Sequence, residues 1–251
     1  MKFERAVCVS ARAGTESAVR IALVGLGKMG RAIEAVAGER GHEVTARIDL
    51  SGAPLAEVVE AARPDVAFEF TQPSAARANV ATLLRLRVPV VCGTTGWAPK
   101  DLEPLTRETG TPLLAAANFS IGVAILRRIA REAAVALRAF ADFEPGLVER
   151  HHSAKVDAPS GTANVLADII ARASGRESVP VVSLRQGGQP GEHTVIFEGP
   201  AESLVITHQA RSREIFATGA VRAAEWLVQA RPVGLLDFDT FLERSGSWNS
   251  A

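Results

Sequence analysis

The segment ERHHSAKVDAPSGTA, which spans Glu149–Ala163, concentrates side chains that donate protons or bind anions. Imidazole titrates near neutral pH, so His151 is a candidate general acid. The PSGT sequence predicts a turn followed by a helix, whose first backbone N–H groups are available to an anion. The Gly161 and Thr162 amides, the Thr162 hydroxyl and the Lys155 ammonium therefore predict an acidic small substrate, most simply a dicarboxylate.

Each member of this cluster also has a purely structural interpretation. Adjacent histidines on a strand point to opposite faces, so either His151 or His152 can be a buried, hydrogen-bonded residue. Lys155 alone is typical of a solvated surface, and Ser160 and Thr162 alone are typical helix caps. The hypothesis of chemistry therefore rests on the cluster as a whole, in which His152 adds positive charge on the substrate side.

A G-x-G-x-x-G pattern lies at Gly25, Gly27 and Gly30. The run IALV before it predicts a buried strand, and the periodic residues after it predict a helix. In that context the first glycine permits a tight turn, the second admits a pyrophosphate and the third allows close helix packing. We therefore expect a dinucleotide site, with a plain strand-to-helix turn as the alternative. The expected contacts include the residues between the glycines, Leu26, Lys28 and Met29.

Asp49 ends the next predicted strand. A carboxylate there accepts hydrogen bonds from an adenosine ribose and repels a 2′-phosphate, which favours NADH. Lys28 and Arg47 are positioned in the sequence to neutralise such a phosphate, so NADPH stays open as well. The alternative for Asp49 is an exposed turn residue.

Two further loops, GTTGW and AANFS, follow predicted strand ends. Ligands of open α/β sheets bind at the carboxyl ends of the strands, and small residues with hydroxyls suit a nicotinamide ribose and amide. The same residue types are common in plain turns. The cofactor contacts expected here are Gly93, Thr94, Thr95, Ala116, Ala117, Asn118 and Phe119.

Two rival chemistries were weighed against this one. A metal site would draw on four histidines that lack ligand spacing or a companion carboxylate pattern, so we predict no metal. Those histidines are His151, His152, His193 and His208. A Ser160 nucleophile activated by Lys155 leaves the glycine loop unexplained, and the G-x-S-x-G sequence is absent.

Length and composition bound the remaining possibilities. The chain has 251 residues, a formal net charge of zero and 47% hydrophobic residues, which is typical of a globular protein of one or two domains. The balanced charge argues against nucleic-acid binding, and no apolar run is long enough to span a membrane. The two cysteines, Cys8 and Cys92, exclude a disulfide framework, and we expect a cytoplasmic protein.

The order of the predicted elements indicates an α/β protein with two parts. Strands alternate with helices up to about residue 118, which predicts a doubly wound parallel sheet of the Rossmann type. We expect residues 1–18 to be a disordered extension and residues 19–118 to be the dinucleotide domain. Residues 119–216 predict an α+β domain with an open mixed sheet, and residues 217–251 predict helix that returns to the first domain.

The quoted segments together resemble the 4-hydroxy-tetrahydrodipicolinate reductase family, also called dihydrodipicolinate reductase. The resemblance rests on VGLGKMGRAI, FTQPSAARANV, GTTGW, ANFSIGV, GEHTVIFEG and HQARSREIFATGA, and above all on ERHHSAKVDAPSGTA. It implies NAD(P)H-dependent reduction of a cyclic dicarboxylic imine in lysine and diaminopimelate synthesis. It also implies a substrate and tetramerisation domain, a homotetramer and closure of the two domains over bound ligands.

The resemblance assigns roles to particular residues. His151 corresponds to the proposed proton donor, and Lys155 to a residue that acts as an acid or stabilises charge. The expected substrate contacts are His152, Gly161, Thr162 and Thr95, and Asp49 takes the place of the acidic ribose contact. Two alternatives stay open: a dinucleotide sensor without catalysis, and a Rossmann oxidoreductase of another dicarboxylate or amino acid.

The sequence departs from the family pattern in three places. The glycine loop resembles a shorter family variant, and Leu50 follows Asp49 where many members have an arginine suited to NADPH. An extra Pro145-Gly146 precedes the histidines, and it predicts a bulge or turn that interrupts a strand.

Overall fold

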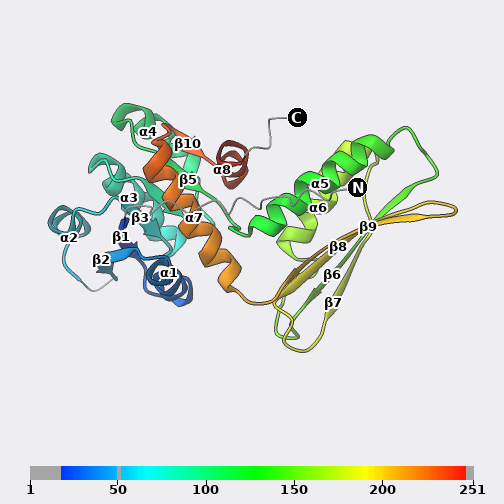
Figure 1. The fold of residues 1–251 in the computed structure, drawn as a ribbon, viewed down its shortest axis with the longest axis horizontal. Helices are drawn as coiled ribbons and strands as arrows, with labels where there is room; N and C mark the ends of the chain where they lie inside the picture. The colour runs from blue at the N-terminus through cyan, green and yellow to red at the C-terminus, as the bar shows by residue number, and fades with distance from the viewer. Residues whose placement is uncertain (1–17, 50–51, 247–251) are drawn as a thin grey trace, which may run out of the picture.

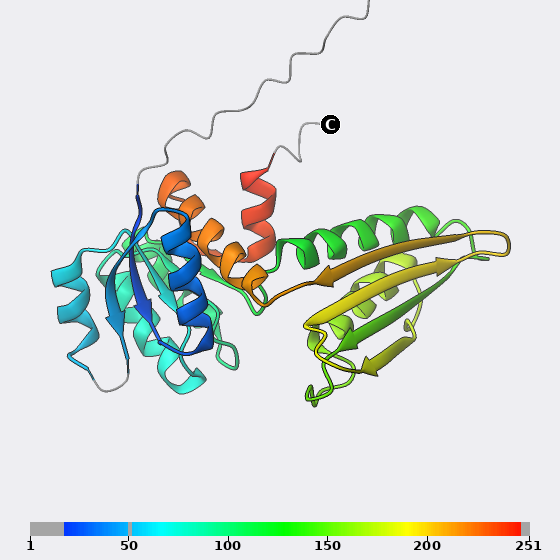
Figure 2. The ribbon, with the colours of Figure 1, turned by 60° about the horizontal axis from the view of Figure 1, so that its bottom comes forward.

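The computed structural model describes residues 18–49 and 52–246, which form two lobes, each built around its own sheet (Figures 1 and 2). The first lobe holds a six-stranded sheet and the second lobe a four-stranded one. Of the predicted disordered extension over residues 1–18, only Ala18 falls within the described residues. Among the helices that are described, none is both long and apolar enough to cross a bilayer.

The first lobe is the predicted doubly wound parallel sheet. Its strands lie in the order β10-β5-β4-β3-β1-β2, and every adjacent pair is parallel. The apolar runs form central strands because both faces of such a sheet are covered by helices. The strands are β1 Arg20–Val24, β2 Glu43–Ile48, β3 Val66–Glu69, β4 Val90–Cys92, β5 Leu113–Ala115 and β10 Leu235–Leu236.

Helices cover both faces of this sheet, and alternate strand residues serve the two sides. The helices of the lobe are α1 Lys28–Glu39, α2 Leu55–Ala62, α3 Pro73–Arg85, the short 3₁₀ helix η1 Pro99–Leu102, α4 Glu103–Thr109, α7 Glu214–Ala230 and α8 Phe238–Ser245. Ile21 and Leu23 of β1 share a core with residues of α1, α7 and α8. Ala22 and Val24 instead share a core with residues of α2 and α3.

The second lobe is a mixed sheet with helices on one face. Its order is β7-β6-β8-β9; β7 runs parallel to β6, and the other pairs are antiparallel. Leu147, Val195 and Phe197 of the sheet share a core with residues of α5 and α6. The elements are α5 Ile121–Leu137, β6 Glu144–His151, α6 Gly161–Ser174, β7 Val181–Arg185, β8 Gly191–Glu198 and β9 Ser203–Ala210.

The predicted bulge or turn at Pro145-Gly146 is wrong. Pairing between β6 and β8 continues in constant register from Glu144 opposite Glu198 to Arg150 opposite Glu192. Proline fits because backbone N–H groups alternate sides along a strand, so Pro145 has its nitrogen on the same side as Leu147. That side of β6 faces β7, but pairing with β7 starts only at Leu147, whose amide bonds the carbonyl of Pro180. The missing N–H of Pro145 therefore removes no hydrogen bond between these two strands.

The helical prediction for the last segment is incomplete. The chain does return to the first lobe, where α7 packs against α1 (Figure 1). After α7, however, Pro232 and Gly234, whose φ is 106°, end the helical conformation. The short strand β10 then joins the edge of the sheet beside β5, and α8 follows it.

A buried ionic cluster holds α7 to the first lobe. Glu225 on α7 receives hydrogen bonds from Arg40 Nε at 2.6 Å and Nη2 at 2.8 Å, and its Oε1 lies 2.7 Å from His42 Nε2. Burial acts to raise the pKa of Glu225, but Arg40 and His42 outweigh burial and lower it below its usual 4.5. The carboxylate is therefore ionised at neutral pH.

We predict that Glu225→Gln lowers the free energy of unfolding by about 2 kcal/mol, because hydrogen bonds to a charged group contribute about that much. The pKa of Glu225 is lower in the folded state than the usual 4.5 that it has in the unfolded chain. The ionised carboxylate therefore stabilises the fold above pH 4.5, and this contribution is lost as the pH falls through the folded-state pKa of Glu225. Urea denaturation at several pH values measures both effects. Glu132→Gln, which removes the partner of the exposed Arg131, should change little; equal losses in both variants would contradict the prediction.

Candidate active site

A cleft of about 950 Å³ collects residues from both lobes. The first lobe contributes one side of α1 from Lys28 to Glu39, the segment after β5, and the starts of α7 and α8. The second lobe contributes the end of β6, the loop that follows it and the start of α6. Its lining includes Lys28, Met29, Ala116, Ala117, Asn118, His151, His152, Lys155, Ser160, Gly161, Thr162, Val165, Arg213, Phe216, Asp237 and Phe238.

The glycine loop has the geometry that a dinucleotide requires. Gly25 has a φ of +99°, and a Cβ added there would lie 2.3 Å from the carbonyl oxygen of Phe70. A Cβ at Gly30 would lie 2.1 Å from the oxygen of Gly25. The chain itself therefore demands glycine at these two positions. At Gly27 no atom lies within 4 Å of such a Cβ, so its open backbone suits the approach of a pyrophosphate.

The start of α1 completes the phosphate-binding geometry. Gly27 is the N-cap, and no side chain caps this end of the helix, so its first amides suit an anion. Leu26 packs against the core. Lys28 and Met29 line the cleft, which places a lysine within the predicted phosphate region.

The two residues predicted to meet the ribose end of a dinucleotide lie at the end of β2. Asp49 is exposed just after β2, beside the Gly25 loop, whose amide bonds the carbonyl of Ile48 at 2.9 Å. Arg47, a candidate phosphate partner, instead bonds the carboxylate of Glu34 at 2.8 Å through Nε.

The loop after β4 is fixed by internal contacts. The Thr94 hydroxyl accepts from the Thr71 amide at 2.8 Å, and Trp97 Nε1 donates to the Thr94 carbonyl at 2.9 Å. A Cβ at Gly93 would lie 2.0 Å from the Phe70 ring. Thr95 is exposed, and none of the three predicted residues Gly93, Thr94 and Thr95 is among those that line the described cleft.

Some residues of the loop after β5 line the cleft, and one packs in the core. Ala116, Ala117 and Asn118 line the cleft. Phe119 is only 3% exposed, and its ring lies between those of Phe70 and Phe238. Its side chain therefore packs in the core instead of facing a cofactor.

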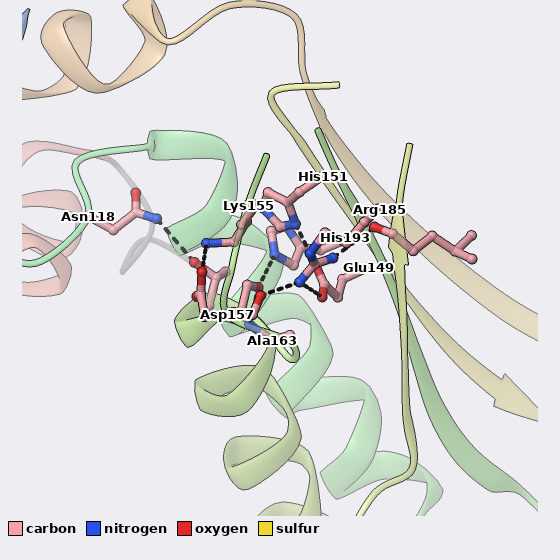
Figure 3. Close-up of polar contacts among 11 residues, drawn as sticks. Asn118, Glu149, His151, Lys155, Asp157, Ala163, Arg185 and His193 are labelled. Carbon is pink, nitrogen blue, oxygen red and sulfur yellow. Dashed lines mark hydrogen bonds and ion pairs between the residues drawn. The ribbon is translucent and has the colours of Figure 1, made fainter. Parts of the chain in front are cut away.

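Asn118 connects the two lobes. Its Oδ1 accepts from the Ser120 amide at 2.8 Å, and its Nδ2 lies 3.4 Å from the Thr162 hydroxyl on α6 (Figure 3). Ser120 in turn caps α5 by accepting from the Val123 amide. The predicted cofactor loop and the predicted substrate helix therefore meet at one point.

Two residues just before α6 bind donors at the helix start: Ser160, which caps the helix, and the carboxylate of Asp157. Ser160 is buried and accepts from the Ala163 amide at 3.2 Å, which is an N-cap contact. Lys155 Nζ lies 2.6 Å from Asp157 Oδ1. Lys155, together with the Gly161 amide, lowers the pKa of Asp157. Asp157 thus binds the same donors that the sequence assigns to a substrate carboxylate.

Val165 lies at the edge of the apolar face of α6. It is exposed and lines the cleft, while Leu166 and Ile170 are buried. The helix turns its buried stripe toward the sheet, which leaves Val165 at the edge.

His151 is buried and bound to an ionised partner (Figure 3). Its Nδ1 contacts Glu149 Oε2, and Arg185 Nη2 donates to Glu149 Oε1 at 2.7 Å. Burial acts to raise the pKa of Glu149, but Arg185 and His151 outweigh burial and lower it. Burial lowers the pKa of His151, and Glu149 opposes that effect.

His152 points to a different partner, as adjacent strand positions require. Its Nε2 lies 3.1 Å from Nη2 of Arg213, and both residues line the cleft. All five cationic or helix-terminal residues predicted for the substrate therefore line one cleft: His151, His152, Lys155, Gly161 and Thr162.

The structure also bears on the two rival chemistries. Glu149, His151 and His193 form a buried group with ligand atoms within 4.8 Å of one another. Of the four histidines considered as metal ligands, only His151 and His193 belong to this group. Its carboxylate, that of Glu149, already pairs with Arg185. Ser160 is 2% exposed and bonds Ala163 and His193, whereas Lys155 bonds Asp157, so no Ser160–Lys155 pair forms.

Several site residues were missed from the sequence. Glu149 was available to sequence reasoning, because it lies two residues before His151 on the same strand face. Arg185 and His193 come from other strands, opposite His151 and Glu149 respectively. The sequence offered His193 only as a metal ligand and gave no signal for Arg185, because strand register cannot be read from one strand. Arg213 lies in HQARSREIFATGA, which was quoted without a role for it.

A Rossmann-type sheet with a glycine loop before α1, and a cleft that His151 and Lys155 share with Lys28 and Met29, define a dinucleotide-dependent oxidoreductase. Gly25, Gly27 and Gly30 themselves are not among the residues that line this cleft. The family profiles described as dihydrodipicolinate reductase, N-terminus and C-terminus, match residues 19–119 and 122–242. The chain belongs to the dihydrodipicolinate reductase family, and it is an NAD(P)H-dependent reductase of diaminopimelate and lysine biosynthesis.

Curated relatives agree with this family. The 4-hydroxy-tetrahydrodipicolinate reductase of Archaeoglobus fulgidus is 35% identical and matches across 90% of this chain and 100% of the relative. That of Pseudoalteromonas atlantica is 36% identical, across 82% and 80% respectively. A solved dipicolinate-bound dihydrodipicolinate reductase from Paenisporosarcina sp. TG-14 shares the fold, with a TM-score of 0.72, 22% identity and coverage of 88% and 97%.

We predict that Gly27→Val weakens NADH binding about tenfold or more while leaving the melting temperature unchanged, because a side chain there meets no protein atom but blocks the pyrophosphate. Fluorescence titration with NADH and thermal melting measure the two quantities. Gly25→Val is the matched control, and it should lower the melting temperature because its φ is +99°. Unchanged NADH affinity in Gly27→Val would contradict the loop assignment.

Proposed function

We propose that the enzyme reduces 4-hydroxy-tetrahydrodipicolinate, after loss of water, to tetrahydrodipicolinate, with His151 as proton donor. The observation that supports these roles most directly is that His151, Lys155 and the start of α6 line the same cleft as Lys28 and Met29 of the glycine loop. The relatives carry this activity in their names, and the solved relative binds dipicolinate.

We assign the substrate carboxylates to the donors at the start of α6. The Gly161 and Thr162 amides and the Thr162 hydroxyl would bind one carboxylate at the positive end of the helix dipole. Lys155, released from Asp157, would bind the same group or its neighbour. His152 and Arg213, which lie 3.1 Å apart, add a second cationic position on the cleft wall. Two separated cationic positions suit a ring with two carboxylates.

The order of charge movement follows from these positions. A dinucleotide held at the glycine loop would supply a hydride to the substrate ring. Negative charge then develops on the conjugated imine, while Lys155, His152 and the amides of α6 hold the carboxylates in place because they are already oriented. His151 neutralises that charge by giving up one proton, so hydride and proton together account for the two hydrogens gained by the ring.

We also propose a homotetramer assembled through the face of the second sheet that α5 and α6 leave uncovered. Val182 and Leu184 lie on that face and are 55% and 44% exposed. Their register partners Val148 and Arg150 lie beside them on β6. The uninterrupted strand through Pro145 supports this proposal, because it leaves the sheet regular up to its end.

We predict that His151→Gln and Lys155→Ala each lower turnover by about a hundredfold or more, the usual effect of losing a general acid or its charge partner. A coupled assay should follow NADH and NADPH oxidation separately while the upstream synthase makes substrate from pyruvate and aspartate semialdehyde. Lys100→Ala, an exposed lysine outside the cleft, should match the unaltered enzyme. Full turnover in both site variants would remove His151 and Lys155 from the mechanism, whereas NADH binding without turnover in the unaltered protein would favour the non-catalytic sensor.

We predict that pyridine-2,6-dicarboxylate inhibits competitively against the dicarboxylate substrate, because it presents a planar ring with two carboxylates to the same donors. Pyridine-2-carboxylate is the matched control and should bind about tenfold more weakly or worse, since it loses one charged contact. Initial-rate kinetics at varied substrate concentration give both inhibition constants. Equal inhibition by the two compounds would remove the two-carboxylate assignment.

A further inference from the structure

Three strands of the second lobe place a buried ionic chain behind His151. Glu149 lies two residues earlier on β6, Arg185 lies opposite His151 on β7, and His193 lies opposite Glu149 on β8. Glu149 is fully buried at 0% exposure. Both of its oxygens are used, Oε1 by Arg185 and Oε2 by His151 Nδ1 (Figure 3).

This arrangement determines which nitrogen of His151 carries a proton. A buried carboxylate is costly unless it is paired, and Arg185 supplies the pair. An ionised carboxylate only accepts hydrogen bonds, so the Nδ1 that contacts it must carry hydrogen. Nε2 is then the ring nitrogen that gains and loses the exchangeable proton. Arg185 also donates to the carbonyl of Asp157, which ties the Lys155 loop to the same chain.

The charged and titratable groups around His151 oppose one another. Lys155 from the following loop and Arg185 from β7 disfavour the imidazolium, whereas Glu149 from β6 favours it. His193 from β8 packs edge-on against His151, with ring centroids 5.2 Å apart. Burial lowers the pKa of His193 to about 4, and burial also lowers that of His208 on β9 behind it, so both are neutral. Glu149 is thus the acidic group that sustains the proton-donating form.

We propose that Glu149, held by Arg185, is a positioning residue that fixes the Nδ1–H form of His151 and directs Nε2 to the substrate. The inference rests on the proposed function of His151 as proton donor. It adds a residue and a geometry to that function, because Glu149 is excluded from the cleft and contacts no substrate.

The test begins with Glu149→Gln, which keeps shape but removes the charge. Turnover should fall by about tenfold to a hundredfold at neutral pH, less than in His151→Gln, with little change in KM. Because a proton donor works only below its pKa, activity falls as the pH rises through that value. Loss of Glu149 removes the group that supports the imidazolium, so this basic limb of kcat should move to lower pH. An unmoved limb would overturn the proposal.

Glu192→Gln is the matched control. Glu192 pairs with Arg150 at 3.3 Å on the same sheet, but Arg150 faces away from Glu149 and His151. Its pH profile should equal that of the unaltered enzyme. A shift in both variants would mean a general loss of charge, and it would count against a specific role for Glu149.

Nitrogen-15 NMR of the unaltered enzyme tests the geometry without an activity measurement. The chain has only five histidines, and His151→Gln assigns the signal of interest. The neutral His151 ring should show protonated Nδ1 and unprotonated Nε2. The opposite tautomer would overturn this inference while leaving His151 as the proton donor, whereas full turnover in His151→Gln would overturn the proposed donor role of His151.

Discussion

The site depends on balancing positive charge in a cleft that must bind anions. His151, Lys155 and Arg185 lie close together beside the positive end of α6. Such a cluster would repel itself unless carboxylates were placed among its members. Glu149 and Asp157 are these carboxylates, and they differ in burial. Glu149 is fully buried and paired with Arg185, whereas the Asp157 side chain is 56% exposed, which is consistent with the proposal that a substrate carboxylate replaces Asp157 at Lys155.

The same constraint explains why the cluster needs a rigid sheet behind it. Glu149 and His151 share one face of β6 with Leu147, which packs in the core with α6. The carboxylate is therefore held by the same packing that stabilises the lobe. Ser160 links the two systems, because its hydroxyl caps α6 and also contacts His193 at 3.3 Å. The start of α6 and the pair of His151 and His193 are therefore connected through one side chain.

The two lobes meet through backbone approach as well as through side chains. Asn118 contacts Thr162, and Phe119 next to it is clamped between Phe70 and Phe238. A Cβ at Gly219 of α7 would lie 1.8 Å from the Phe119 carbonyl oxygen, so the returning helix presses directly on this segment. The C-terminal helices therefore fix the position at which the chain crosses from cofactor to substrate.

The sequence alone determined the alternation of strands and helices, the glycine loop and the residues of the ERHHSAKVDAPSGTA cluster, because these depend on local periodicity and turn chemistry. It misjudged Pro145-Gly146 and missed β10, because both depend on which neighbouring strand is present. Only the tertiary structure decided that Arg185 and His193 stand beside Glu149 and His151. Side chains from separate strands meet through register, and register is set by the packing of whole elements, which no single segment encodes.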